Sequence, residues 1–178
     1  MAGKAGSYAP DLAIRDGKRY LAYLTGLTGL DADPGTLWLK TDASGTWTTK
    51  KAATGITGLG QLAPSLAVTS DGLARIAFED GAIKVAFAST KVGSFSVDTV
   101  TGTTGADRQP VLLLNASDGP VVLFTSDPSG TANDGVYLRG KGGATWAGVK
   151  VSSRIGALDA MLEGSTITAT VGGTTVGT

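Results

Sequence analysis

The sequence repeats itself about every 45 residues, and this period restricts the folds open to the chain more than any other feature. Three segments align: APDLAIRDGKRYLAYLTG from Ala9, APSLAVTSDGLARIAFEDG from Ala63 and QPVLLLNASDGPVVLFTSD from Gln109. A more divergent copy, GALDAMLEGSTITATVGG, begins at Gly156. The landmark positions that we treat as equivalent are Pro10, Pro64, Pro110 and Ala157. Such copies predict a row or ring of similar structural units.

Within each copy the pattern predicts four antiparallel strands. Apolar runs such as SLAV and VLLL are typical of a strand that is buried on both faces. The segments TLWLK, IKVAFA and GVYLR alternate like a third strand, and a polar fourth strand carries Trp47, Phe95 or Trp146. An acidic residue and a glycine form the first turn of each copy, a pair suited to tight hairpins: Asp16-Gly17, Asp71-Gly72, Asp118-Gly119 and Glu163-Gly164.

Short four-stranded units at this spacing predict an all-β protein made of β-propeller blades, rather than a β-sandwich with accidental self-similarity. We expect a single domain over residues 1–178, with blades at about 9–55, 63–103 and 109–153 and a partial blade at 156–178. A partial ring of about three and a half to four blades would leave apolar faces open at both ends.

Closure of that ring by self-association is therefore expected, either as a homodimer that completes the propeller or as a larger assembly. Two other solutions stay open at this point. The chain is one piece of a larger protein, or its incomplete last blade closes a four-bladed ring.

Composition removes several functional classes. The sequence has 15 Lys and Arg residues and 15 Asp and Glu residues, so its formal net charge is zero. Nucleic acid is therefore not an expected partner, because its binding requires an excess of basic residues. The sequence has neither cysteine nor histidine, which excludes disulfides, thiolate or imidazole metal sites and Ser-His-Asp catalysis. Neither a signal-peptide core nor a run of ~20 apolar residues occurs, which predicts a soluble chain without membrane insertion and leaves its location unknown.

The stretches KTDASGTW at 40–47 and RGKGGATW at 139–146 resemble degenerate Asp boxes, the S-x-D-x-G-x-T-W hairpins of sialidase-type propellers. Together with the repeats, they make the chain similar to bacterial sialidase-like β-propellers. The resemblance implies a propeller fold in which this hairpin is structural and lies away from the active site. Arg139 and Lys141 stand where the family has Ser and Asp. The resemblance therefore implies the scaffold and not sialidase activity.

The candidate binding residues lie in two long loops and before one landmark proline. Residues 25–35 and 125–135 join the second and third strands, on the propeller face that usually carries binding. Arg108 and Gln109, just before Pro110, would lie at the mouth of the central channel. The loops supply carboxylates that could ligate Ca²⁺, although solvated loop tips are the simpler interpretation: Asp31, Asp33, Asp127 and Asp134.

From these observations we predict a non-catalytic β-propeller module that binds a glycan or protein ligand on its long-loop face, as a lectin-like or adhesion module does. A structural component of a virion or surface assembly is the alternative, and a glycoside hydrolase fragment is the least favoured interpretation. No catalytic residue, resident metal or cofactor is assigned. Hydrolysis by a pair of the loop Asp residues is not favoured, because nothing in the sequence desolvates one of them against another.

Overall fold

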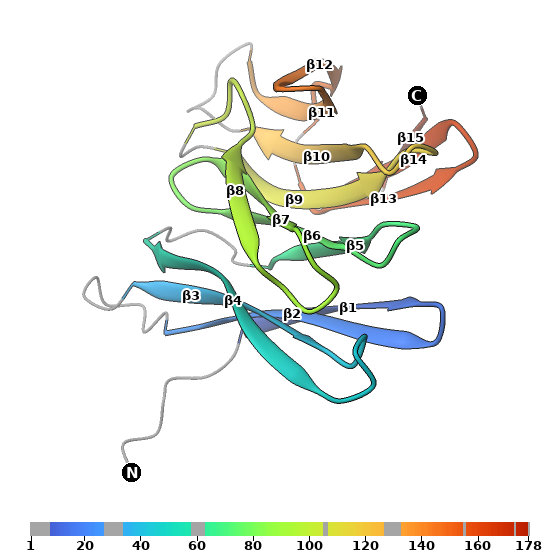
Figure 1. The fold of residues 1–178 in the computed structure, drawn as a ribbon. Coiled ribbons are helices and arrows are strands. Elements are labelled where there is room, and N and C mark those ends of the chain that lie inside the picture. The colour runs from blue at the N-terminus through green and yellow to red at the C-terminus, as the bar shows by residue number, and fades with distance from the viewer. Residues whose placement is uncertain are drawn as a thin grey trace.

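The computed structural model describes residues 8–26, 34–57, 63–104, 107–126, 133–154, 156–172 and 174–177. These residues form antiparallel strands in four sheets that follow one another along the chain (Figure 1). They include no helix with the length and apolar character that a membrane crossing requires.

Each sheet is a blade whose strands pair in chain order. Blade 1 contains β1 (Tyr8–Arg15), β2 (Lys18–Thr25), β3 (Gly35–Thr41) and β4 (Thr48–Ile56). Blade 2 contains β5 (Ser65–Val68), β6 (Ala74–Glu79), β7 (Ile83–Ala88) and β8 (Phe95–Thr99). Blade 3 contains β9 (Asp107–Leu114), β10 (Pro120–Ser126), β11 (Gly135–Gly142) and β12 (Thr145–Ser152). Blade 4 has β13 (Leu158–Glu163), β14 (Thr166–Val171) and β15 (Thr174–Gly177). The predicted partial propeller is confirmed.

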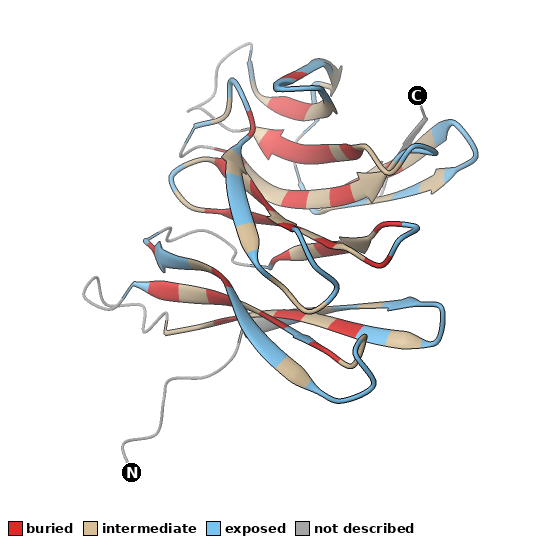
Figure 2. Cartoon of the chain, in the orientation of Figure 1, coloured by how far each residue is buried: buried red, intermediate tan, exposed pale blue. Residues whose placement is uncertain are grey.

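The core lies between consecutive blades rather than at one centre. Leu24 and Leu39 of blade 1 pack with Ile76 of blade 2, and separate apolar clusters join blade 2 to blade 3 and blade 3 to blade 4. The outer strands β4 and β8 are mostly exposed, whereas β6 and β10 are almost wholly buried (Figure 2). Stacking of each sheet on the next therefore supplies most of the burial that stabilises the fold.

The first strand of each later blade packs against the preceding blade through an equivalent residue. The residue two places after the landmark proline faces the preceding blade, and Leu66 and Leu112 at this position are only 7% and 4% exposed. In blade 4 the residue that faces blade 3 is Leu158, so Gly156 and not Ala157 occupies the landmark position. Our alignment of the fourth copy was wrong by one residue, which matters because successive side chains of a strand point to opposite faces.

Polar side chains also bridge neighbouring inner strands. Asp11 Oδ2 accepts a hydrogen bond of 2.6 Å from the Leu66 amide, and Ser65 Oγ accepts one of 2.9 Å from the Leu112 amide. Both acceptors directly follow a landmark proline, so this bond recurs from blade 1 to 2 and from blade 2 to 3. An inner edge has no strand partner for its amides, and the side chains supply the missing acceptors. Val111, at the same position in blade 3, has no acceptor in its side chain.

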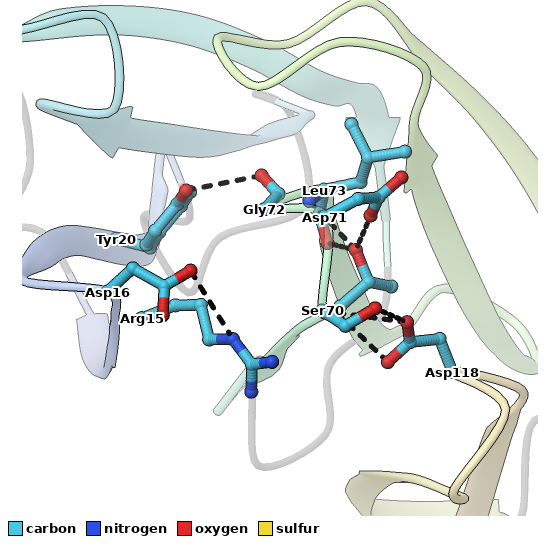
Figure 3. Close-up of polar contacts among 9 residues, drawn as sticks. Arg15, Asp16, Tyr20, Ser70, Asp71, Gly72, Leu73 and Asp118 are labelled. Atoms are coloured by element: carbon cyan, nitrogen blue, oxygen red, sulfur yellow. Dashed lines mark hydrogen bonds and ion pairs between the residues drawn. The ribbon is translucent and has the colours of Figure 1, made fainter.

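A second set of bridges lies at the Asp-Gly turns (Figure 3). Tyr20 of blade 1 donates its hydroxyl to the Gly72 carbonyl of blade 2 at 3.2 Å. The Ser70 amide and hydroxyl donate to the Asp118 carboxylate of blade 3, the amide at 2.9 Å from Oδ2. These bonds hold the pKa of Asp118 below its ordinary value, the hydroxyl contributing most. Blade 1 is therefore joined to blade 2, and blade 2 to blade 3, both along the inner strands and at the turns.

Removing the Ser65 acceptor tests the inner-strand bridges. We expect Ser65→Ala to lower the free energy of unfolding by about 1–3 kcal/mol, because the Leu112 amide keeps its burial and loses its partner. Ser65→Asp, which copies the acceptor of blade 1, should retain most of that stability. Chemical denaturation measures both, with exposed Ser96→Ala as the control, for which a change within about 0.5 kcal/mol is expected. Equal effects of Ser65→Ala and Ser96→Ala would contradict the bridge.

Candidate functional site

A cluster of charged and polar side chains lies at the end of the blades opposite the Asp-Gly turns. Glu79 ends β6, and Asp107, Arg108 and Gln109 begin β9 of the next blade. Antiparallel pairing brings these positions to one end, because the connection after the second strand of a blade and the connection into the next blade both lie there. We call these four residues the Glu79 cluster.

Glu79 is a buried carboxyl group at the centre of the cluster. Its Oε1 accepts a hydrogen bond of 2.7 Å from the Gln109 amide, and its Oε2 lies 3.8 Å from Arg108 Nε. Among the described residues, no hydrogen-bond donor reaches Oε2. Burial raises the pKa of Glu79 above its ordinary value; the Gln109 amide and the Arg108 guanidinium oppose this shift, and the charge of Asp107 adds to it. Burial therefore makes Glu79 a weaker acid than an exposed glutamate, although the Arg108 guanidinium and the Gln109 amide favour its ionised form.

The backbone around Arg108 and Gln109 is irregular. Gln109 has a φ of 54°, a left-handed value that is uncommon for a residue other than glycine. The register with β10 shifts between Leu123 and Thr125, and the Thr125 hydroxyl donates to the Arg108 carbonyl at 3.1 Å. Asp107 is buried, and its carboxylate accepts from the Thr104 amide. Bulges and left-handed residues of this kind re-aim side chains and are enriched at functional sites.

Asp80 follows Glu79 directly but has the opposite environment. Lys84 Nζ donates to its Oδ2 at 2.6 Å, and the Thr57 amide from the end of blade 1 donates to its Oδ1 at 3.1 Å. Burial opposes ionisation of Asp80, but the bonds from Lys84 and Thr57 outweigh it and hold the pKa below its ordinary value. Two adjacent carboxyl groups thus have pKa values displaced in opposite directions, an arrangement that separates a proton donor from an anion.

The structure places two of the predicted site residues, Arg108 and Gln109, in this cluster beside Glu79. Asp134 is half-buried and directly precedes β11. Asp31, Asp33 and Asp127 lie outside the described residues. No group of three or more acidic side chains that could hold a metal ion occurs in the described part of the chain, and the Ca²⁺ site stays a prediction.

Sequence reasoning missed Glu79, Asp80 and Asp107 as site residues. The available signal was in β6, whose sequence ARIAFE ends an otherwise largely apolar strand with a carboxylate. Five of its six positions are buried, including that of Glu79. A glutamate that closes a strand buried on both faces is a candidate for an altered pKa. The burial itself comes from the neighbouring blades and is not visible in the local pattern.

Solved structures of glycoside hydrolases share the arrangement of these blades. The GH43_1 enzyme from Xanthomonas citri complexed with xylotriose has a TM-score of 0.56 and 12% identity, with 96% of this chain and 67% of the enzyme covered. CoXyl43, a GH43 β-xylosidase/α-arabinofuranosidase from a compost microbial metagenome, has a TM-score of 0.56 and 12% identity, with 93% and 69% covered. The GH43 endo-arabinanase from Bacillus licheniformis has a TM-score of 0.54 and 13% identity, with 97% and 72% covered.

These enzymes are five-bladed β-propellers, and the likeness shows the propeller fold for this chain. The chain spans about two thirds of their length. No family model and no curated protein matches the sequence.

The neighbours contradict the functional class predicted from the sequence. That prediction was a non-catalytic module for binding or adhesion, with a component of a virion or surface assembly as the alternative. The propellers that share this fold are glycoside hydrolases, the class that we had placed last. The prediction was wrong because repeat-level resemblance indicates a scaffold and carries little information about activity. The resemblance is confirmed for the β-propeller, and its Asp boxes stay a prediction.

Opposite pH dependences should distinguish Glu79 from Asp80. The pKa of Glu79 is higher in the native chain than in the unfolded chain, so the native chain holds the Glu79 proton more tightly. The contribution of Glu79 to the free energy of unfolding therefore falls as the pH rises above about 4.3. The pKa of Asp80 is lower in the native chain than in the unfolded chain. The contribution of Asp80 to the free energy of unfolding is therefore present above about pH 3.9 and is lost as the pH falls through the native pKa.

We therefore expect the free energy of unfolding of the wild type, relative to that of Glu79→Gln, to decrease as the pH rises. Relative to that of Asp80→Asn, it should increase as the pH rises. Urea unfolding at a series of pH values measures both slopes. Slopes of the same sign would show that the two carboxyl groups do not differ in this way.

Proposed function

We propose that this chain is a carbohydrate-active β-propeller of the glycoside hydrolase type, and that the Glu79 cluster contacts its glycan. Two independent observations support the proposal. The fold is shared with GH43 enzymes, one of them complexed with xylotriose and another an endo-arabinanase. The cluster lies at the blade end where β2 and β10 end and β3 and β11 begin, and connections between strands are the usual position of binding residues in such scaffolds. Xylose- and arabinose-based oligosaccharides are therefore the substrates proposed.

The environment of Glu79 suits the proton donor of glycoside hydrolysis. This reaction uses one carboxyl group that keeps its proton and a second that is ionised. Burial raises the pKa of Glu79, and its Oε2 has no hydrogen-bond donor among the described residues, so the proposal assigns the donated proton to that oxygen. The carboxylate of Asp107 is close enough for its charge to contribute to that raised pKa, and it is the second carboxyl group of the proposal.

In the proposed reaction the Glu79 carboxyl gives its proton to the glycosidic oxygen as the bond from that oxygen to the anomeric carbon breaks. The Asp107 carboxylate takes a proton from the water that attacks the anomeric carbon, so that the water oxygen enters the sugar product. Arg108, half-buried beside Glu79, is suited to donate hydrogen bonds to sugar hydroxyls. The burial of Glu79 in contact with Arg108 and Gln109 is the observation on which this assignment depends.

Hydrolysis of aryl β-xylosides, aryl α-arabinofuranosides, xylotriose and linear arabinan tests the proposal. We expect cleavage of at least one of these substrates and a loss of about 100-fold or more in kcat for Glu79→Gln, because the proton donor is removed. Asp16→Asn is the matched control, since Asp16 is an exposed carboxylate in a turn at the opposite end.

Asparagine also tolerates the left-handed backbone of Asp16, so the control should keep full activity. Wild-type protein that neither cleaves these substrates nor binds the oligosaccharides in calorimetry would refute the proposal. Cleavage that is unchanged in Glu79→Gln would refute the assigned role of Glu79.

A further inference from the structure

Blade 1 has an apolar sheet face that no other described part of the chain covers. Leu12 and Ile14 of β1 are 59% and 67% exposed. The strand register places Leu21 opposite Leu12, and Trp38 opposite Tyr23, on the same side of the sheet. We call the side formed by these five residues the blade 1 open face. Apolar side chains that gather on an uncovered sheet face mark an interaction site.

The equivalent surface in later blades is an inter-blade contact. Leu12 stands two places after its landmark proline, as do Leu66 and Leu112, which are buried against blades 1 and 2. The Leu12 position is therefore built to receive the sheet of a preceding blade. Blade 1 comes first along the chain, and this position remains exposed.

Blade 4 has the complementary open surface. Leu158 and Ala160 of β13 pack on blade 3, and the residues between and after them point the other way. Met161 is 53% exposed there, and Asp159 and Glu163 are exposed on the same side. The strand register adds threonines from β14 to this side, which we call the blade 4 open face: Asp159, Met161, Glu163, Thr166, Thr168 and Thr170.

The two open faces carry opposite charges. Lys40 lies opposite Leu21 and Lys51 opposite Trp38, so both lysines border the blade 1 open face. Neither forms an ion pair within the described part of the chain, whereas the nearby Arg19 is already paired with Asp42 at 2.7 Å. The blade 4 open face has two carboxylates, Asp159 and Glu163. Opposite charges around an apolar contact select the partner and its orientation.

We propose that the blade 4 open face of one copy packs on the blade 1 open face of a second copy, head to tail. In this contact Leu12 of the second copy faces blade 4, as Leu66 and Leu112 face their preceding blades within the chain. Pairing of two blade 1 open faces would bring the lysines of both copies together, which like-charge repulsion disfavours. Each copy has one face of each kind, so a head-to-tail contact joins copies in one direction, into a closed ring or an open row according to the rotation at the contact.

Face-specific variants with light scattering test this association. Leu12→Glu/Ile14→Glu disables only the blade 1 open face, and Met161→Arg disables only the blade 4 open face. All three positions are more than half exposed, so the changes should leave each chain folded, as circular dichroism would verify. Val149→Glu is the control, because Val149 is 62% exposed on the outer strand β12 and belongs to neither face.

We expect the wild type and the control to associate, and each face variant to be monomeric alone. A one-to-one mixture of the two face variants should recover a dimer, because each partner keeps the face that the other has lost. A monomeric wild type at every concentration would overturn the proposal, as would a mixture that stays monomeric. Association of Met161→Arg alone would show that two blade 1 open faces pair with each other, and would overturn the head-to-tail arrangement.

Discussion

The structure depends on the packing of each sheet against the next, because no blade can bury both of its faces alone. Residues such as Leu66, Ile76 and Leu112 lose their exposure to water only when the preceding blade is in place. The repeated proline, the apolar inner strand and the tight turn produce one blade, and the interface between blades gives that blade its stability. The Glu79 cluster has the same origin, since Glu79 belongs to blade 2 and its partners belong to blade 3.

Local sequence features predicted the blades well. Turn chemistry and strand alternation are properties of neighbouring residues, so Asp16-Gly17 and Asp118-Gly119 identified hairpins that the structure contains. The fourth copy was misaligned by one residue because neither Gly156 nor Ala157 is a proline, and the choice between them depends on which face of β13 meets blade 3. That choice is made by tertiary packing and is not written in the local pattern.

The candidate site was only half predictable. Arg108 and Gln109 were located by topology alone, whereas the altered pKa of Glu79 arises from burial by a neighbouring sheet. A propeller scaffold serves many activities, so the repeats could not identify the functional class, and the side-chain environments at the loop end were needed to propose one. The contrast between Glu79 and Asp80 shows how strongly such environments differ between adjacent residues.

The series of acceptors after the landmark prolines has a consequence for motion. Asp11 and Ser65 tie blade 1 to blade 2 and blade 2 to blade 3, but the aliphatic side chain of Val111 offers no such tie to blade 4. Among the described residues, this inner-strand bond is therefore not repeated between blade 3 and blade 4, where an apolar cluster joins the two sheets. Of the described blades, blade 4 is the one that this difference favours to open as a unit while the others stay folded.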